Sequence, residues 1–326
     1  MGKGISSLHV TLLYKVRHCN RNIPARTRLI YNLKDMFASV ILLIALAAAH
    51  TAAAQEHRIA PTWLHRNLAS AQESKSGITT STCHYKPLFG EGDADRKALA
   101  GIARYGEALL DPHGTCSALQ LPHEDEIYVV LQGNGFAAYG SENVALNKDD
   151  YLYVPAGTHH ALSNSSDTPM HVIAMGFRTN GLEPAPVPQH PLKANIDAVP
   201  TQTVSGHPAS ALYRLLLGDV NSKRDRIAAG RAVTSLFVME IAPGGTNTPH
   251  HHEREEEIYL VLSGHGDMVA GGGTNGIEGK HPAQAGDAYF FRLNCTVGYY
   301  SAPDTKTRIL AVRSWYPGMA KENLDH

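Results

Sequence analysis

Two histidines and a glutamate in the last third of the chain have the types and spacing of a metal site. His250 and His252 are two positions apart, and Glu257 follows five positions later. Alternate residues of an extended strand share one face, so the two imidazoles should point the same way. Glu257 begins the next apolar segment and can face them across a sheet. Two imidazoles and one carboxylate suit a divalent transition metal, namely Fe, Mn, Ni, Cu or Zn.

The same residues have a second interpretation as a solvated, charged turn. His251 lies between the two histidines, and acidic residues occupy positions 253 and 255–257. His251 should point outward in either case. The spacing and the apolar run 258–262 after the glutamate favour the metal site.

The segments that must position these residues are short and apolar, with turn signals between them, as in sandwiches and barrels. Residues 93–103 are the one candidate for a short helix after the first 54 residues. The predicted strands are 126–131, 150–154, 171–177, 233–241, 257–262, 288–293 and 308–314. The expected fold class is therefore all-β.

The two halves of this β-rich region repeat each other. Residues Glu126 to Gly133 read EIYVVLQG, and residues Glu257 to Gly264 read EIYLVLSG. Further on, DYLYV at 150–154 aligns with DAYFF at 287–291. The order and spacing agree, apart from extra residues in a Gly-rich segment at 271–279. An internal repeat of this length indicates two copies of one domain.

The repeat resembles the cupin superfamily over residues 100–180 and 230–316. The second half holds every position of the first cupin motif, at Gly244, His250, His252, Glu257 and Gly264. The resemblance implies two antiparallel jelly-roll β-barrels in tandem, the bicupin arrangement. It also implies that the two histidines and Glu257 line the inside of the second barrel as metal ligands.

The second half departs from the second cupin motif. Val297 stands where the family has its fourth ligand, a histidine. The remaining two histidines and one carboxylate resemble the facial triad of non-haem iron enzymes, which leaves positions on the metal open for substrate and oxygen. The loss of the fourth ligand equally fits a site that has degenerated and binds metal weakly. Cys295 is either a further ligand or a small packed residue. Strand parity places Tyr259, Arg292 and Tyr299 in a pocket beside the metal.

The first half departs in the opposite place. Leu119 and Leu121 stand at the two motif histidines, while Glu126 and His160 remain. Metal centres with only two protein ligands fall short of the three or four that zinc sites use, so we expect a degenerate site. The alternative is a hydrogen bond between His160 and Glu126 in an apolar pocket. Each barrel is expected to be closed, so the halves should not share one site.

Residues 1–54 read as an export leader. A basic segment precedes an apolar run from Phe37 to Ala54, which ends in a small-x-small pattern before polar Gln55. Cleavage near Ala54 would release a periplasmic or secreted protein, and an uncleaved N-terminal anchor is the alternative. Either Met1 or Met36 can be the start.

An oxidising compartment permits disulfides. Cys83 and Cys116 are the candidate pair, and isolated thiols are the other interpretation. Beyond the leader, the predicted division is an N-terminal extension 55–99, a first barrel 100–180, a Pro-rich linker with a connecting strand 181–229, and a second barrel 230–326.

Composition narrows the function class. Hydrophobic residues make up 43% and charged residues 18%, with a net charge of −1. No basic stripe or zinc-finger spacing occurs, so nucleic acid is not an expected partner. The expected partners are a small molecule and, through a barrel edge, a second copy of the chain.

Three functions remain open from the sequence. The first is a metal-dependent enzyme acting on a small molecule, for which the cupin resemblance implies oxygenase (dioxygenase), decarboxylase, isomerase or lyase chemistry. The second is a non-catalytic protein that binds a small molecule or sugar. The third is a structural two-barrel protein.

Overall fold

The computed structural model describes residues 61–182, 188, 190–272 and 278–319. The predicted leader 1–54 lies outside these residues. Within them the chain is almost entirely β-strand, as predicted. The expected helix over 93–103 is confined to one short 3-10 turn, η1 (Arg96–Ala98), because the strand β3 already begins at Ile102. No helix in the described ranges has the length and hydrophobicity to cross a membrane.

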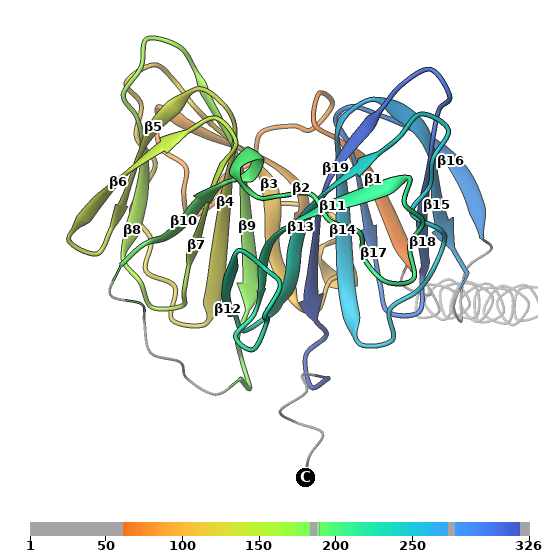
Figure 1. The fold of residues 1–326 in the computed structure, drawn as a ribbon. Coiled ribbons are helices and arrows are strands. Elements are labelled where there is room, and N and C mark those ends of the chain that lie inside the picture. The colour runs from red at the N-terminus through yellow and green to blue at the C-terminus, as the bar shows by residue number, and fades with distance from the viewer. Residues whose placement is uncertain (1–60, 183–187, 189, 273–277, 320–326) are drawn as a thin grey trace, which may run out of the picture. The chain divides into compact units, whose positions relative to one another are not determined.

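The first barrel, light orange to green in Figure 1, consists of two sheets. A six-stranded sheet has the order β10-β7-β4-β9-β3-β2, and a three-stranded sheet has the order β6-β5-β8. The strands are β2 (Cys83–Gly90), β3 (Ile102–Leu110), β4 (Glu124–Gln132), β5 (Asn134–Tyr139), β6 (Glu142–Asn147), β7 (Asp150–Val154), β8 (His160–Asn164), β9 (Met170–Arg178) and β10 (Leu192–Asn195).

The second barrel repeats this plan. A seven-stranded sheet has the order β1-β17-β14-β19-β13-β11-β12, and a three-stranded sheet has the order β16-β15-β18. Neighbouring strands are antiparallel except for the pair β11 and β12. The strands are β1 (Trp63–Asn67), β11 (Ala211–Asp219), β12 (Ile227–Gly230), β13 (Val233–Ile241), β14 (Glu255–Ser263), β15 (His265–Gly271), β16 (Gly279–Gln284), β17 (Asp287–Phe291), β18 (Thr296–Ser301) and β19 (Thr307–Trp315).

The barrels exchange one edge strand each. The strand β1 precedes the first barrel in the chain but pairs with β17 of the second. The strand β10 precedes the second barrel but pairs with β7 of the first. The predicted boundaries 100–180 and 230–326 are therefore too narrow. The segments taken as extension and linker supply strands to both barrels, because a strand pairs with whichever edge is open and not only with its sequence neighbours.

The apolar runs are nearly continuous because both faces of the long strands are buried. On β4, Tyr128 and Val130 face the interior of the first barrel, while Ile127 and Val129 join a core that both barrels share. The strand β14 divides its residues in the same way. The alternating parity of a strand thus assigns each motif residue to one face.

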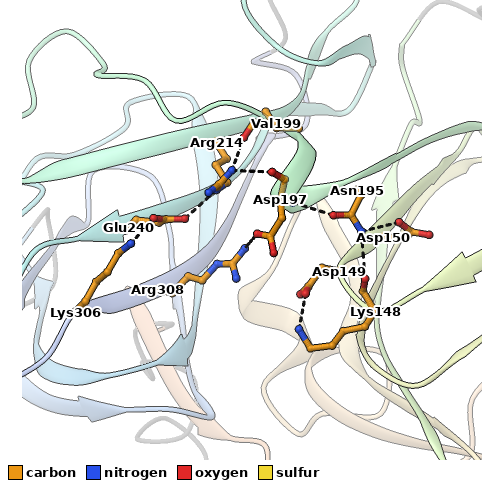
Figure 2. A network of polar contacts seen from close by, with 10 residues as sticks. All are labelled: Lys148, Asp149, Asp150, Asn195, Asp197, Val199, Arg214, Glu240, Lys306 and Arg308. Carbon is orange, nitrogen blue, oxygen red and sulfur yellow. Dashed lines mark hydrogen bonds and ion pairs between the residues drawn. The ribbon is translucent and has the colours of Figure 1, made fainter.

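Polar contacts also join the barrels around the second 3-10 turn, η2 (Ile196–Ala198) (Figure 2). Asn195 donates to Asp150 of the first barrel at 2.9 Å. Asp197 forms an ion pair with Arg308 of the second at 2.6 Å. Arg214 donates to the carbonyl of Val199 at 2.6 Å. The segment between β10 and β11 is therefore a polar bridge between the two barrels.

Candidate metal centre in the second barrel

The backbone around the two motif histidines is held by β18. The N–H of His250 donates to the carbonyl of Val297 at 2.9 Å, and the N–H of Val297 donates back at 2.8 Å. The carbonyl of His252 accepts from the N–H of Asn294 at 2.8 Å. Glu257 lies on β14, two residues into the strand. His250 is thus paired with β18 of the three-stranded sheet, while Glu257 comes from β14 of the seven-stranded sheet.

The three predicted ligands come together. One ligand atom of each of His250, His252 and Glu257 lies within 4.8 Å of the others. Nε2 of His252 is 3.3 Å from Oε2 of Glu257, and the two imidazole centroids are 4.9 Å apart. His251 is more than half exposed and lies beside Glu253, so it points outward.

A backbone contact sets the tautomer of His250. Its Nδ1 lies 2.9 Å from the carbonyl of Thr248. A carbonyl oxygen can only accept, so Nδ1 carries the proton and Nε2 keeps a free lone pair. Metal-bound histidines are typically oriented through such a contact of the other ring nitrogen. Burial lowers the pKa of His250, which favours the neutral, ligating form.

The carboxylate of Glu257 is buried without a hydrogen-bond donor. It is 1% exposed, and neither of its oxygens has a hydrogen-bond partner, nor does Nε2 of His252. Burial by itself would raise the pKa of Glu257, but the nearby His252 and Arg313 outweigh it and hold the pKa below its ordinary value. Buried charges in proteins are normally paired or bound to metal. The residues present therefore fit a divalent cation.

These groups line a cavity of about 210 Å³. Of the three residues predicted to line a pocket, only Tyr259 does so. Tyr299 lies two residues beyond Val297 on β18 and is packed in the barrel core. Arg292 follows β17, where its N–H donates to the carbonyl of Thr62. Strand parity fixes a face but not the depth along the strand, which is why these two residues are not among those that line the cavity.

Several lining residues escaped the sequence analysis. His207 and Arg224 fall in the predicted linker. Because no strand bounds are predicted there, the sequence does not indicate which way these side chains point. Arg313 lies on β19 directly opposite Glu257. Its place on a predicted strand was the signal that could have found it. The other lining residues that were missed are Val204, Ser205, Tyr213, Leu215, Ser235 and Phe237.

The cysteines are structural in the described chain. Cys83 and Cys116 form a disulfide, which ties the start of β2 to the loop before β4. Cys295 is buried and its thiol lies 3.5 Å from the carbonyl of Gly271. It is not part of the ligand group, so it packs as a small residue.

The first barrel has different residues at the corresponding motif positions. Leu119 pairs with His160 there, as His250 pairs with Val297 in the second barrel. His160 lies 2.9 Å from Glu126 and also contacts Tyr128 at 2.9 Å. Arg104 donates to Glu126 at 2.5 Å. Protein donors thus satisfy the carboxylate of Glu126, and a guanidinium supplies the positive charge.

The two arginines that face the motif glutamates come from different strands. In the first barrel Arg104 lies on β3 and Gly176 occupies the position opposite Glu126 on β9. In the second barrel Ser235 takes the position of Arg104, and Arg313 takes that of Gly176. A Cβ on Gly176 would lie 3.1 Å from Oε2 of Glu124, tighter than most contacts, and 3.4 Å from the Cβ of Arg104, so a side chain there would crowd these residues.

Comparisons with known proteins agree with this architecture. A candidate glyoxylate-induced protein from Pseudomonas aeruginosa superposes with a TM-score of 0.61 at 14% identity, over 78% of this chain and 88% of its own. The protein Ylba from E. coli gives a TM-score of 0.58 at 15% identity, over 78% and 92%. The oxalate decarboxylase of Bacillus subtilis gives 0.57 at 10% identity, over 79% and 78%. At these identities the similarity concerns the fold.

Sequence comparison points the same way. An uncharacterised protein of Methanocaldococcus jannaschii is 28% identical over 53 residues, which is 16% of this chain and 42% of that protein. The chain thus spans less than half the length of this curated relative. The cupin domain family matches residues 106–176 and 237–313, one match in each barrel. The chain therefore belongs to the cupin family, as a two-domain protein with two tandem barrels.

Proposed function

We propose that the chain is a metal-dependent cupin enzyme that acts on a small molecule in its second barrel. His250, His252 and Glu257 would hold one divalent transition metal. The observation that carries the proposal is the buried carboxyl of Glu257, whose two oxygens have no hydrogen-bond donor while two imidazoles lie beside it.

A metal in this position would act as a Lewis acid or as an activator of oxygen. The chain supplies three ligands, so positions on the metal stay open for a substrate, as in catalytic metal sites. Tyr213 also lines the cavity, and its hydroxyl has no hydrogen-bond partner. Burial raises the pKa of Tyr213, so it remains a neutral O–H donor toward a bound molecule.

The reaction classes that we propose are those of the sequence analysis: oxygenase, decarboxylase, isomerase or lyase. Oxalate decarboxylases from Bacillus subtilis and Lactobacillus farciminis are among the structural neighbours, and manganese(II) centres are named for the Bacillus enzyme. These names make manganese the first metal to test. The size of the cavity, below the 300–1,000 Å³ of drug-sized pockets, favours a small substrate.

Metal content of the purified protein tests the proposal. We expect about one divalent metal per chain in the wild type after loading with Mn²⁺ or Fe²⁺, measured by elemental analysis. The variants His250→Ala, His252→Ala and Glu257→Gln should retain less than about a tenth of it, because two remaining ligands fall short of a catalytic centre. His251→Ala is the matched control and should load like the wild type.

Two results would count against the proposal. One is a wild type that holds well under one metal per chain after loading. The other is equal metal content in His251→Ala and in the ligand variants. Circular dichroism of each variant separates loss of metal from loss of fold.

A binding protein without turnover is the second candidate. The unpartnered donors around the cavity, on Tyr213, Ser235 and Arg313, would serve binding as well as catalysis. Such a protein would be stabilised by its ligand through mass action, even after the metal is removed by a chelator. An enzyme of the proposed kind would lose that stabilisation with the metal.

We also propose that the protein is exported and works in the periplasm or outside the cell. The leader-like residues 1–54 support this location, and so does the disulfide between Cys83 and Cys116, since disulfides persist in oxidising compartments.

A further inference from the structure

The second barrel keeps an arginine and a glutamate apart where the first barrel joins them. Arg104 contacts Glu126 at 2.5 Å, whereas Nε of Arg313 is 3.9 Å from Oε1 of Glu257. The Nε of Arg313 is buried and has no hydrogen-bond acceptor. One buried N–H donor of Arg313 and the carboxylate of Glu257 therefore line one cavity without a hydrogen bond between them.

We infer that this cavity binds a small carboxylate, anchored by Arg313 next to the metal. The inference rests on the proposed function, because the metal occupies Glu257 and leaves Arg313 for an anion. It names the class of substrate or ligand, which the three metal ligands alone leave open.

The charges around the cavity favour an anion most when the metal is bound. Arg313 lies 3.3 Å from Glu255, so this pair carries no net charge. Arg224 lies 3.8 Å from Asp225, with the same result. Glu257 leaves one negative charge, and a divalent metal with neutral imidazoles turns it into one positive charge. The loaded cavity therefore attracts an anion more strongly than the metal-free cavity does.

Arg313 is held in a fixed orientation for this role. Its Nη1 donates to Glu255 at 3.3 Å, and its guanidinium lies 5.7 Å from the centre of the Phe237 ring. These contacts leave the buried Nε of this cavity-lining side chain without an acceptor. A planar guanidinium matches the planar carboxylate and is more specific for it than a lysine.

Other unpartnered donors fit the same ligand. The hydroxyls of Ser235 and Tyr213 line the cavity and are buried without partners. A carboxylate offers about four acceptor positions to such donors. Val204 and Leu215 add an apolar wall, which suits a short carbon chain. The volume of about 210 Å³ restricts the ligand to a small one.

Paired probes of equal size test the role of charge. Malonate and malonamide have the same shape, and only malonate is charged. We expect the manganese-loaded wild type to bind malonate at least tenfold more tightly than malonamide in isothermal titration calorimetry. The metal-free protein should bind malonate at least tenfold more weakly than the loaded protein.

Variants test the role of Arg313. Arg313→Gln should load manganese normally and bind malonate at least tenfold more weakly. Arg308→Gln, on the same strand but paired with Asp197 outside the cavity, is the matched control and should stay within twofold of wild type. If Arg313→Gln fails to fold, Arg313→Lys keeps the charge but removes Nε, and malonate should bind at least threefold more weakly.

Equal binding of malonate and malonamide would overturn the inference, and so would unchanged malonate affinity in the folded Arg313 variants. A protein that loads manganese but binds no malonate would overturn it while the metal proposal stands. If the wild type loads no manganese, the metal measurement already contradicts the proposed function, and the inference that rests on it is contradicted as well.

Discussion

At the scale of single residues, one arginine decides what each barrel does with its motif glutamate. In the first barrel Arg104, His160 and Tyr128 all contact Glu126, so its buried charge is satisfied by protein groups. In the second barrel the corresponding tyrosine, Tyr259, accepts from Asn247 instead. Glu257 is left for a ligand, which is the basis of the metal proposal.

The first-barrel network should contribute strongly to stability. Arg104→Leu would leave the buried Glu126 without its guanidinium, at a cost of about 3–5 kcal/mol in the free energy of unfolding. Arg308→Leu breaks a more exposed pair with Asp197 and should cost about 1 kcal/mol or less. Urea denaturation of both variants measures the difference. Equal losses in the two variants would contradict this account of the network.

At the scale of elements, each barrel is completed by a strand that precedes the other barrel in the chain. The strand β1 extends the second barrel beyond β17, and β10 extends the first beyond β7. Both cover an edge that would otherwise expose unpaired N–H and C=O groups. The exchange leaves the motif-bearing strands β4 and β14 in their own barrels, so the two halves do not share one site.

The disulfide at the entrance to β2 should stabilise the first barrel. Cys83 and Cys116 are 33 residues apart, and closing a loop of that length in the unfolded chain is worth about 3–4 kcal/mol. We expect the double variant Cys83→Ala/Cys116→Ala to lose this amount in urea denaturation. A reductant should lower the stability of the wild type by a similar amount and leave the double variant unchanged. A wild type indifferent to reductant would refute the prediction.

At the scale of the whole molecule, the residue just before each motif glutamate faces the other barrel. Glu256 is fully buried and accepts from the N–H groups of Ala100 and Gly101, at 2.8 and 2.7 Å. Asp125, its counterpart in the first barrel, is equally buried. Strand parity explains this division, since neighbouring residues point to opposite faces. One face serves the barrel interior and the other joins the barrels.

The buried carboxyl of Glu256 should make the free energy of unfolding depend on pH. Burial raises the pKa of Glu256 above its ordinary value, despite the backbone N–H groups that lower it. A raised pKa in the folded state means that stability is lost as the pH rises through it. The wild type should therefore gain stability relative to Glu256→Gln as the pH falls from neutral toward 4.

Urea denaturation at a series of pH values measures this difference. Glu253→Gln is the matched control, because Glu253 is largely exposed three residues earlier and should show no such trend. A wild-type advantage that is constant over the whole range would show that Glu256 titrates alike in the folded and unfolded chains.

Much of the fold and part of the site could be predicted from the sequence. The repeat, the all-β class and the grouping of His250, His252 and Glu257 follow from local spacing and from the period of a strand. The degenerate pair Glu126 and His160 also follows, since both motifs could be aligned position by position. These features depend on residues that are close in the chain or repeated within it.

The tertiary structure alone decided the rest. Parity states which face a side chain takes, but not which strand lies opposite or how deep the residue sits. The exchanged strands β1 and β10, the pairing of Cys83 with Cys116, and the cavity lining depend on contacts between distant segments. The same holds for Arg313, which comes from another strand than Arg104 and lies farther from its glutamate. The sequence by itself thus determined the two barrels and the ligand residues. The packing of distant strands decided which barrel keeps an open carboxylate.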